Sequence, residues 1–456
     1  MIGSDSMIPY YGRLALASFR RTPGITALMV LAIAIGIGAC VVTLTIYHAM
    51  SGNPIWWKND VLYSVTLDNW DPNEPADPQR PALPPDQMTY KDAEVVWRSD
   101  IPKSTTIMYR TSGIVSGDGP RGAFEPANAP TRVVTSGFFS MFEVPFQYGK
   151  PWNHRADIGP EPLIVLSRKL NDKIFGGQNS VDRTIRWNDR EFRIVGVLDY
   201  WEPQPRFYDL NNGNFAIPED AYIPWKWSET LSLTSAGSSN CWKIENIDSP
   251  EGFRNSECSW IQVWVELPNA SARDRMQAML DNYTDEQKKS GRFQRPRNNR
   301  LTDVGTWLVV QRVVSSDYRV LVGLAFAFLA VCLINTIGLL LAKFLNAAPL
   351  SGVRRALGAS RRDLFTQHMV EVGVIAAAGA GLALAIAALG LAGIRMLYTT
   401  SAAFTAGSGG MRGLAHMDIA SYGFAVGLAI IATLICGLYP AWRVGRLHPA
   451  AYLKNQ

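Results

Sequence analysis

Four long uncharged runs divide the chain, and a long polar segment separates the first run from the second. The runs cover residues 24–50, 320–342, 372–394 and 419–442. As a helix, the first run would be about 40 Å long, more than the roughly 30 Å of a bilayer's hydrocarbon core. It also exceeds the roughly 7–15 apolar residues of a signal peptide, which favours an uncleaved signal anchor. The pattern predicts four membrane-spanning helices.

The polar segment alternates in the manner of strands and carries shorter helical patterns. We expect strands from Val61, from Thr105 and over 261–267, and a polar amphipathic helix after the last of these. Further expected elements are a helix over 89–97, a strand–helix unit over 163–177 and a hairpin turning at Asn188-Asp189. Residues 225–259 are rich in Ser, Asn and Gly and predict an inserted subdomain. The fold class is therefore four transmembrane α-helices with a large α+β domain inserted between the first and the second.

Basic residues are concentrated on one side of the spans, and the 396–418 loop on the other side is nearly neutral, which orients the chain because basic loops stay in the cytoplasm. The predicted organisation is a cytoplasmic N-terminus (1–23), first helix (24–50), outer domain (51–317), second helix (318–343), cytoplasmic segment (344–365), third helix (366–395), short outer loop (396–418), fourth helix (419–442) and cytoplasmic tail (443–456). Both termini are then cytoplasmic. We attribute the net charge of +5 to the basic residues beside the spans, and not to a surface that binds nucleic acid.

Motifs for known chemistry are missing. The sequence has no phosphate-binding loop of the G-x-x-x-x-G-K-[ST] type, no H-E-x-x-H motif and only five scattered histidines. No feature selects an acid–base pair among the outer carboxylates, and the uncharged runs hold none of the intramembrane charges that ion-coupled carriers need. We therefore expect neither a catalytic site nor a metal site, and a membrane part that moves as a scaffold.

The cytoplasmic segment contains a compact basic stretch at residues 353–364. Arg354, Arg355, Arg361 and Arg362 surround a centre of small residues. Taken alone, the stretch could simply fix the topology of two spans. The alternative is a contact for cytosolic machinery, made by Val353, Arg354, Arg355, Ala356, Leu357, Gly358, Ala359, Ser360, Arg361 and Arg362.

Cysteines and small residues add two expectations. Cys241 and Cys258 are the only cysteines of the outer domain, and an oxidising compartment favours a disulfide between them. Small residues recur at every fourth position in two spans and form stripes on which helices can approach closely. These stripes are Ala32, Gly36 and Cys40 in the first span and Gly373, Ala377, Gly381 and Ala385 in the third.

Several stretches together resemble the MacB/FtsX-type ABC transporter permeases, also called type VII or mechanotransmission ABC systems. GVRRALGASRRDLFTQHMVE, from Gly352, is similar to the family's cytoplasmic G-[IV]-R-R-A-L-G-A-S element. GLYPAWRVGRLHPAAYLK, from Gly437, resembles the family's C-terminal element. FFSMFEVPFQYGKPW, VLSRKLNDKIFGG and REFRIVGVL are similar to blocks of its periplasmic core domain, and AYIPW to the strand before its inserted subdomain.

The resemblance implies a non-enzymatic membrane subunit in the bacterial inner membrane, without a cofactor of its own. A separate cytosolic ATPase dimer would bind ATP and Mg and dock at residues 353–362, and a second permease would complete the complex. ATP-driven motion of the outer domain would then serve efflux through a periplasmic adaptor and an outer-membrane channel. The alternatives are an FtsX-like regulator of a periplasmic enzyme and a lipoprotein-extracting permease. An ectoenzyme has no supporting motif.

One departure from the family pattern shapes the expected partners. Members of the family commonly have R-E-I-G before the arginines, whereas this chain has Pro349-Leu350-Ser351-Gly352 and so lacks the acidic residue. A paralogous permease that keeps the acidic residue could compensate, which favours a heterodimer over a homodimer. We also expect residues 353–364 to form one short helix along the membrane surface, with Gly358 allowing close approach to the ATPase.

Overall fold

The computed structural model describes residues 7–119, 122–401 and 419–445, and it divides the chain into two compact units. The first unit, the membrane unit, comprises the described residues of 1–51, 314–403 and 411–456. The second, the outer unit, comprises residues 52–313. In chain order the outer unit therefore follows the first long helix and precedes the second.

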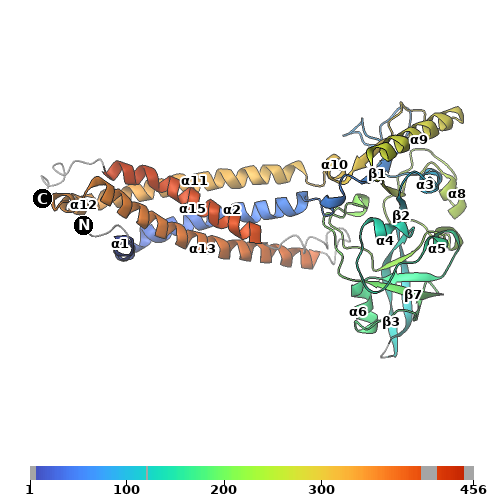
Figure 1. The fold of residues 1–456 in the computed structure, drawn as a ribbon, viewed down its shortest axis with the longest axis horizontal. Coiled ribbons are helices and arrows are strands. Elements are labelled where there is room, and N and C mark those ends of the chain that lie inside the picture. Colours follow the sequence, from blue (N-terminus) through green and yellow to red (C-terminus); the bar gives the residue numbers. More distant parts are fainter. Residues whose placement is uncertain (1–6, 120–121, 402–418, 446–456) are drawn as a thin grey trace. The chain divides into compact units, whose positions relative to one another are not determined.

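The described part of the membrane unit is helical. Its elements are α1 (Met7–Arg21), α2 (Pro23–Ser51), α11 (Ser316–Asn346), α12 (Ala348–Ala356), α13 (Arg361–Ser401) and α15 (Ile419–Gly445). Among the described helices, α2, α11, α13 and α15 are long and apolar enough to cross a membrane. These four helices run side by side in Figure 1, and they match the four uncharged runs of the sequence.

Close contacts between these helices depend on glycine. A Cβ added at Gly36 of α2 would lie 3.1 Å from both Cys332 Cβ and Leu329 Cδ1 of α11. On another face of α2, a Cβ at Gly38 would lie 2.9 Å from Ile386 Cγ2 of α13. Glycine lets the helix backbones approach and strengthens van der Waals packing, which associates helices where lipid removes the hydrophobic driving force.

Strands of the outer unit form one mixed sheet. They are β1 (Leu62–Thr66), β2 (Ser104–Gly119), β3 (Gly122–Val134), β4 (Phe146–Gly149), β5 (Leu163–Leu166), β6 (Thr184–Trp187), β7 (Arg190–Leu198), β8 (Ala221–Pro224), β9 (Gln262–Glu266) and β10 (Arg300–Asp303). The order is β10-β1-β9-β2-β3-β8-β5-β7-β4, with β6 pairing both β2 and β7. The pairings β2–β3–β8–β5–β7–β6–β2 therefore close into a circuit, which protects those strand edges.

The described part of the outer unit also contains helices, several of which contact the sheet. They are α3 (Tyr90–Trp97), α4 (Gly137–Met141), α5 (His154–Ile158), α6 (Arg168–Phe175), α7 (Trp227–Thr230), α8 (Pro250–Asn255), α9 (Ala270–Lys289) and α10 (Val304–Val310), with short 3-10 turns at Trp56–Lys58 and Leu210–Asn212. On α9 the buried side chains are Ala272, Met276, Leu280 and Thr284, one per turn. This spacing is the apolar stripe of a surface helix.

Local expectations from the sequence agree with this fold. The expected helix at 89–97 is α3, and Thr89 caps it by accepting a hydrogen bond from the Asp92 N–H. The expected hairpin is β6–β7, with φ of 46° and 64° at Asn188 and Asp189, the left-handed values that such tight turns require. The strand–helix unit is β5–α6, which ends at Gly176 in the left-handed conformation.

Three local features add to the sequence expectation. The segment 225–259, expected as an inserted subdomain, contributes Trp225, Trp227 and Cys258 to the main hydrophobic core of the outer unit. The expected cytoplasmic start contains the helix α1. The segment before the second span contains β10 and α10, whose short lengths gave no clear periodicity in the sequence.

Candidate functional site

The basic stretch at 353–364 is not the single short helix that we expected. Helix α12 begins earlier, at Ala348, and ends at Ala356, and α13 begins at Arg361. Gly358 between them has φ +103°, a conformation that other residues rarely adopt. A Cβ added there would meet nothing within 4 Å, so within this chain Gly358 serves the turn and not close packing.

Ser360 explains why a new helix starts after the turn. The Ser360 hydroxyl accepts from the Asp363 N–H at 3.2 Å, and the Ser360 N–H donates to Asp363 Oδ2 at 2.9 Å. This reciprocal pattern is a capping box with aspartate as the acidic partner. The basic stretch is therefore a helix end, a glycine turn and a capped helix start.

Apolar side chains project into solvent from this turn. Leu357 is 83% exposed and Val353 is 47% exposed. Arg361 and Arg362 are exposed as well, whereas Ala359 is half-buried and the side chain of Ala356 lies outside the described part. An exposed leucine beside exposed basic residues is the composition of a protein-binding surface with a charged rim.

The altered stretch before the arginines forms the first turn of α12. Pro349 occupies a position in this turn, where its missing N–H costs nothing because the first helical N–H groups lack partners inside the helix. The side chains of Leu350 and Ser351 lie outside the described part. Pro349 thus has a local role in starting the helix.

A buried ion pair lies near the basic stretch, and sequence analysis did not find it. Lys343 Nζ of α11 lies 2.7 Å from Glu371 Oε1 of α13, with side-chain exposures of 4% and 7%. Ser18 of α1 donates to the same Glu371 oxygen at 2.7 Å. Lys343 also donates to Thr26 Oγ1 of α2 at 3.3 Å and lies 4.6 Å from the ring centroid of Phe19. The pair therefore joins four helices.

Helix α12 is tied to the same region. Arg354 Nη1 donates to Gln367 Oε1 at 2.6 Å, which links α12 to α13. Gln367 lies one residue before His368, whose ring packs at a tilt against Phe344 with centroids 4.2 Å apart. A force on α12 can therefore reach α13 and α11 through contacts between neighbouring side chains.

The two small-residue stripes have different surroundings. Gly36 and Cys40 are buried against α11, and Cys40 Sγ donates to the Ala325 carbonyl at 3.2 Å, while Ala32 is half-buried. This first stripe is therefore used for close packing inside the chain, against α11. In the second stripe Gly373 is half-buried, and the exposed members are Ala377, Gly381 and Ala385.

In the outer unit the structure joins Cys241 and Cys258 by a disulfide, as the compartment argument predicts. Cys40, Cys332 and Cys436 are free and buried in the membrane unit. The described residues contain no group of three or more His, Cys, Asp or Glu side chains that could hold a metal ion.

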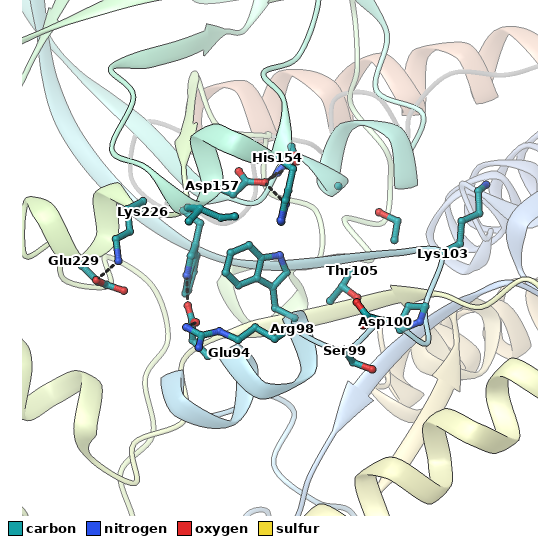
Figure 2. Close-up of a pocket in the computed structure, with 17 residues that line it drawn as sticks. Glu94, Arg98, Ser99, Asp100, Lys103, Thr105, His154, Asp157, Lys226 and Glu229 are labelled. Carbon is teal, nitrogen blue, oxygen red and sulfur yellow. Dashed lines mark hydrogen bonds and ion pairs between the residues drawn. The ribbon is translucent and has the colours of Figure 1, made fainter.

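A polar groove of about 770 Å³ opens between α3, α5 and α7 of the outer unit. Figure 2 shows His154 and Asp157 across the groove from Glu94 and Arg98. The charges already pair with each other, because Arg98 contacts Glu94 at 2.6 Å and Lys226 contacts Glu229 at 2.6 Å. The side chains that line the groove therefore include no cluster of unpaired charges that would indicate a class of ligand.

Serine, histidine and aspartate meet in this groove, but not in the order of a hydrolase. Ser136 Oγ donates to Asp157 Oδ2 at 2.6 Å, and His154 Nδ1 lies 3.5 Å from the same oxygen. In a catalytic triad the histidine lies between serine and aspartate. Burial raises the pKa of Asp157, although hydrogen bonds from Ser136 and Trp152 oppose this effect. The aspartate here holds the start of α4 to α5.

A second buried cluster, called the arginine–carboxylate cluster, stabilises the outer unit. Arg132 contacts both Asp209 and Glu219, and Arg206 Nη1 lies 3.1 Å from Glu219. Burial alone would raise the pKa of Asp209, but the two arginines lower it to about 2. They also lower the pKa of Glu219. Because the four charges are fully buried, their mutual pairing is what makes the cluster tolerable.

Comparison with solved structures of related domains gives weak overall superpositions. The periplasmic region of MacB from Actinobacillus actinomycetemcomitans is 14% identical, with a TM-score of 0.35, and the match covers 57% of this chain and 96% of that one. The extracellular domain of the noncanonic ABC-type transporter YknZ from Gram-positive bacteria is 13% identical, with a TM-score of 0.32 over 53% of this chain and 100% of that one.

Comparison of the sequence gives a related protein and two matching domain families. The pyoverdine export ATP-binding/permease protein PvdT of Pseudomonas aeruginosa is 22% identical over 322 residues, which are 70% of this chain and 41% of that protein. The chain thus spans less than half the length of this relative. Residues 26–283 match the MacB-like periplasmic core domain, and residues 322–449 match the FtsX-like permease C-terminal domain. With the first match covering more than half of the chain, and with four helices that can cross a membrane, this multipass membrane protein belongs to the MacB/FtsX-type ABC transporter permeases.

Proposed function

We propose that the chain is the permease subunit of an ABC machine in the bacterial inner membrane, with both termini in the cytoplasm and residues 51–317 in the periplasm. A separate cytosolic ATPase dimer supplies the energy and binds ATP and Mg. The permease converts ATP hydrolysis into motion of its periplasmic domain. The observation that carries this proposal is the exposed Leu357 at a basic turn between two helices able to span the membrane, within a chain of this family.

Efflux is the favoured use of this motion, through a periplasmic adaptor and an outer-membrane channel. The name of the Pseudomonas relative describes an exporter, which supports efflux over the other uses. An FtsX-like regulator of a periplasmic enzyme, or a lipoprotein-extracting permease, is the alternative. Complexes isolated from native membranes distinguish them, because the co-purifying chain is an adaptor, a cell-wall hydrolase or a lipoprotein carrier.

The docking role of the turn has a direct test. Leu357→Asp leaves the fold intact because the side chain is 83% exposed, but it places a charge where an apolar contact is needed. Losing the burial of one leucine costs about 1.5–3 kcal/mol, so docking weakens at least tenfold. ATPase stimulation by the reconstituted permease is measured for wild type, Leu357→Asp and the conservative control Leu357→Met. Full stimulation by Leu357→Asp, at normal membrane insertion, contradicts the docking role.

For the second permease we propose a paralogue that keeps the family's acidic residue before the arginines, so that the complex is a heterodimer above an ATPase pair. The exposed second stripe, Ala377, Gly381 and Ala385, offers a face for helix contact. Native mass spectrometry of the purified complex decides the composition. Two copies of this chain without a second permease contradict the heterodimer and leave a homodimer.

A further inference from the structure

A pocket of about 300 Å³ lies in the membrane unit between α1, α11, α12 and α13, and neither the family match nor the proposed docking explains it. Its polar lining includes Arg21, Lys343, Arg354, His368 and Glu371. Three of these are cations and one is an anion, so the pocket carries a positive excess. Because Lys343 already pairs with Glu371 at 2.7 Å, Arg21 and Arg354 supply this excess.

His368 is the second sign of a ligand. The residue is only 2% exposed, and neither of its ring nitrogens has a hydrogen-bond partner among the described residues. Its Nδ1 lies 3.9 Å from Glu371 Oε2, beyond hydrogen-bond distance. A buried polar group without a partner costs about 1–3 kcal/mol. A hydrogen-bond acceptor in the pocket would accept from the ring N–H and remove part of this cost.

Arg354 can contribute to the same acceptor. A guanidinium has five N–H donors, and the contact with Gln367 Oε1 uses one of them. Arg21 ends α1 at the pocket wall and is exposed. Two guanidinium groups and an imidazole around one cavity form a donor set that suits a phosphate oxyanion.

The position of the pocket along the helices distinguishes a lipid from a free anion. The uncharged runs 24–50, 320–342 and 372–394 begin or end within two residues of Thr22, Lys343 and Glu371, all of which line the pocket. The cavity is thus level with the boundary between the apolar core and the headgroups. Apolar side chains, among them Leu14 and Phe344, complete the lining and suit a glycerol backbone.

We propose that this pocket binds the phosphate headgroup of an anionic phospholipid. Basic pockets between spanning helices are known to hold such headgroups. The bound lipid would join α1, α11, α12 and α13 through Arg21, His368 and Arg354. Because α12 adjoins the proposed docking turn, the lipid would brace that turn from the membrane side, yet its binding does not depend on an ATPase.

The test is native mass spectrometry of the full chain released from phosphatidylcholine nanodiscs with and without phosphatidylglycerol. Wild type is expected to retain one phosphatidylglycerol molecule. His368→Phe keeps the ring contact with Phe344 but removes both nitrogens, and it is expected to lower retention because a hydrogen-bond donor is lost. Arg21→Gln removes a surface guanidinium and is expected to lower retention about fivefold, the contribution of one basic group at a membrane. Arg13→Gln, an exposed arginine of α1 outside the pocket lining, is the matched control and is expected to retain the lipid.

Three results overturn the proposal. One is equal retention by wild type, His368→Phe and Arg21→Gln. Another is equal retention of phosphatidylcholine, which shows that the pocket does not select negative charge. The third is displacement of the lipid by inorganic phosphate at a similar concentration, which assigns the pocket to a free anion. Should His368→Phe fail to fold, Arg21→Gln still decides, because its side chain is exposed.

Discussion

Removal of Lys343 offers the sharpest test of how the membrane unit is held together. In Lys343→Met the Glu371 carboxylate stays buried, and the Ser18 hydroxyl at 2.7 Å remains its close hydrogen-bond donor among the described residues. At 2.7 Å and an effective dielectric constant of about 20, the attraction between the two charges is about 6 kcal/mol. Part of it offsets desolvation, and breaking one side of a buried pair costs about 3–5 kcal/mol.

Free cysteines make this cost measurable in the full chain. Cys40, Cys332 and Cys436 are buried in the membrane unit, whereas the cysteines of the outer unit are in a disulfide. Labelling by a thiol-reactive dye during heating in detergent therefore reports unfolding of the membrane unit. We expect the midpoint of Lys343→Met to fall by on the order of 10 °C, since 1 kcal/mol corresponds to about 2–4 °C for a unit of this size.

A double variant separates the charge pair from side-chain packing. Lys343→Met combined with Glu371→Leu removes both charges and leaves none uncompensated, so its midpoint should lie close to that of wild type. The single variant Glu371→Gln should fall between the two, because Lys343 keeps Thr26 and the ring of Phe19. A wild-type midpoint for Lys343→Met, or a double variant as unstable as the single one, refutes a pairing energy of this size.

Two further predictions concern single positions. Asp209 has a pKa of about 2 in the folded protein against an ordinary 3.8, so its ionisation contributes about 2 kcal/mol to the stability of the outer unit; this contribution is present above pH 4 and is lost as the pH falls toward 2. The dependence of stability on pH in this range, followed by tryptophan fluorescence during acid unfolding, should therefore be less steep in Asp209→Asn. An unchanged slope contradicts the assignment. Gly36→Ala should lower the stability of the membrane unit by about 1–3 kcal/mol, because the added Cβ would lie 3.1 Å from side-chain atoms of α11. The control Gly381→Ala adds a Cβ with no atom within 4 Å, so it should leave stability unchanged in the same thiol-labelling assay.

Local features of this protein could be predicted from the sequence because each depends on residues close together in the chain. A bilayer requires about 20 apolar residues to span it as a helix, so the four uncharged runs identify α2, α11, α13 and α15. The turn at Asn188-Asp189 and the helix expected over 89–97 follow from side chains that favour those backbone conformations. The resemblance to the permease family indicates a periplasmic core domain and a permease C-terminal domain, and the family matches over 26–283 and 322–449 confirm both.

The tertiary structure alone decided which of these features meet. Ser18 and Glu371 are 353 positions apart, and nothing in either sequence neighbourhood indicates their contact. A stripe of small residues shows that a helix can be approached, but not from which side, so the stripe at Gly36 is covered by α11 while Ala377 stays exposed. The break at Gly358 depends on how α12 turns into α13, and the pocket at His368 depends on four helices converging. Such long-range contacts arise from packing of whole elements, which the pattern of one segment does not contain.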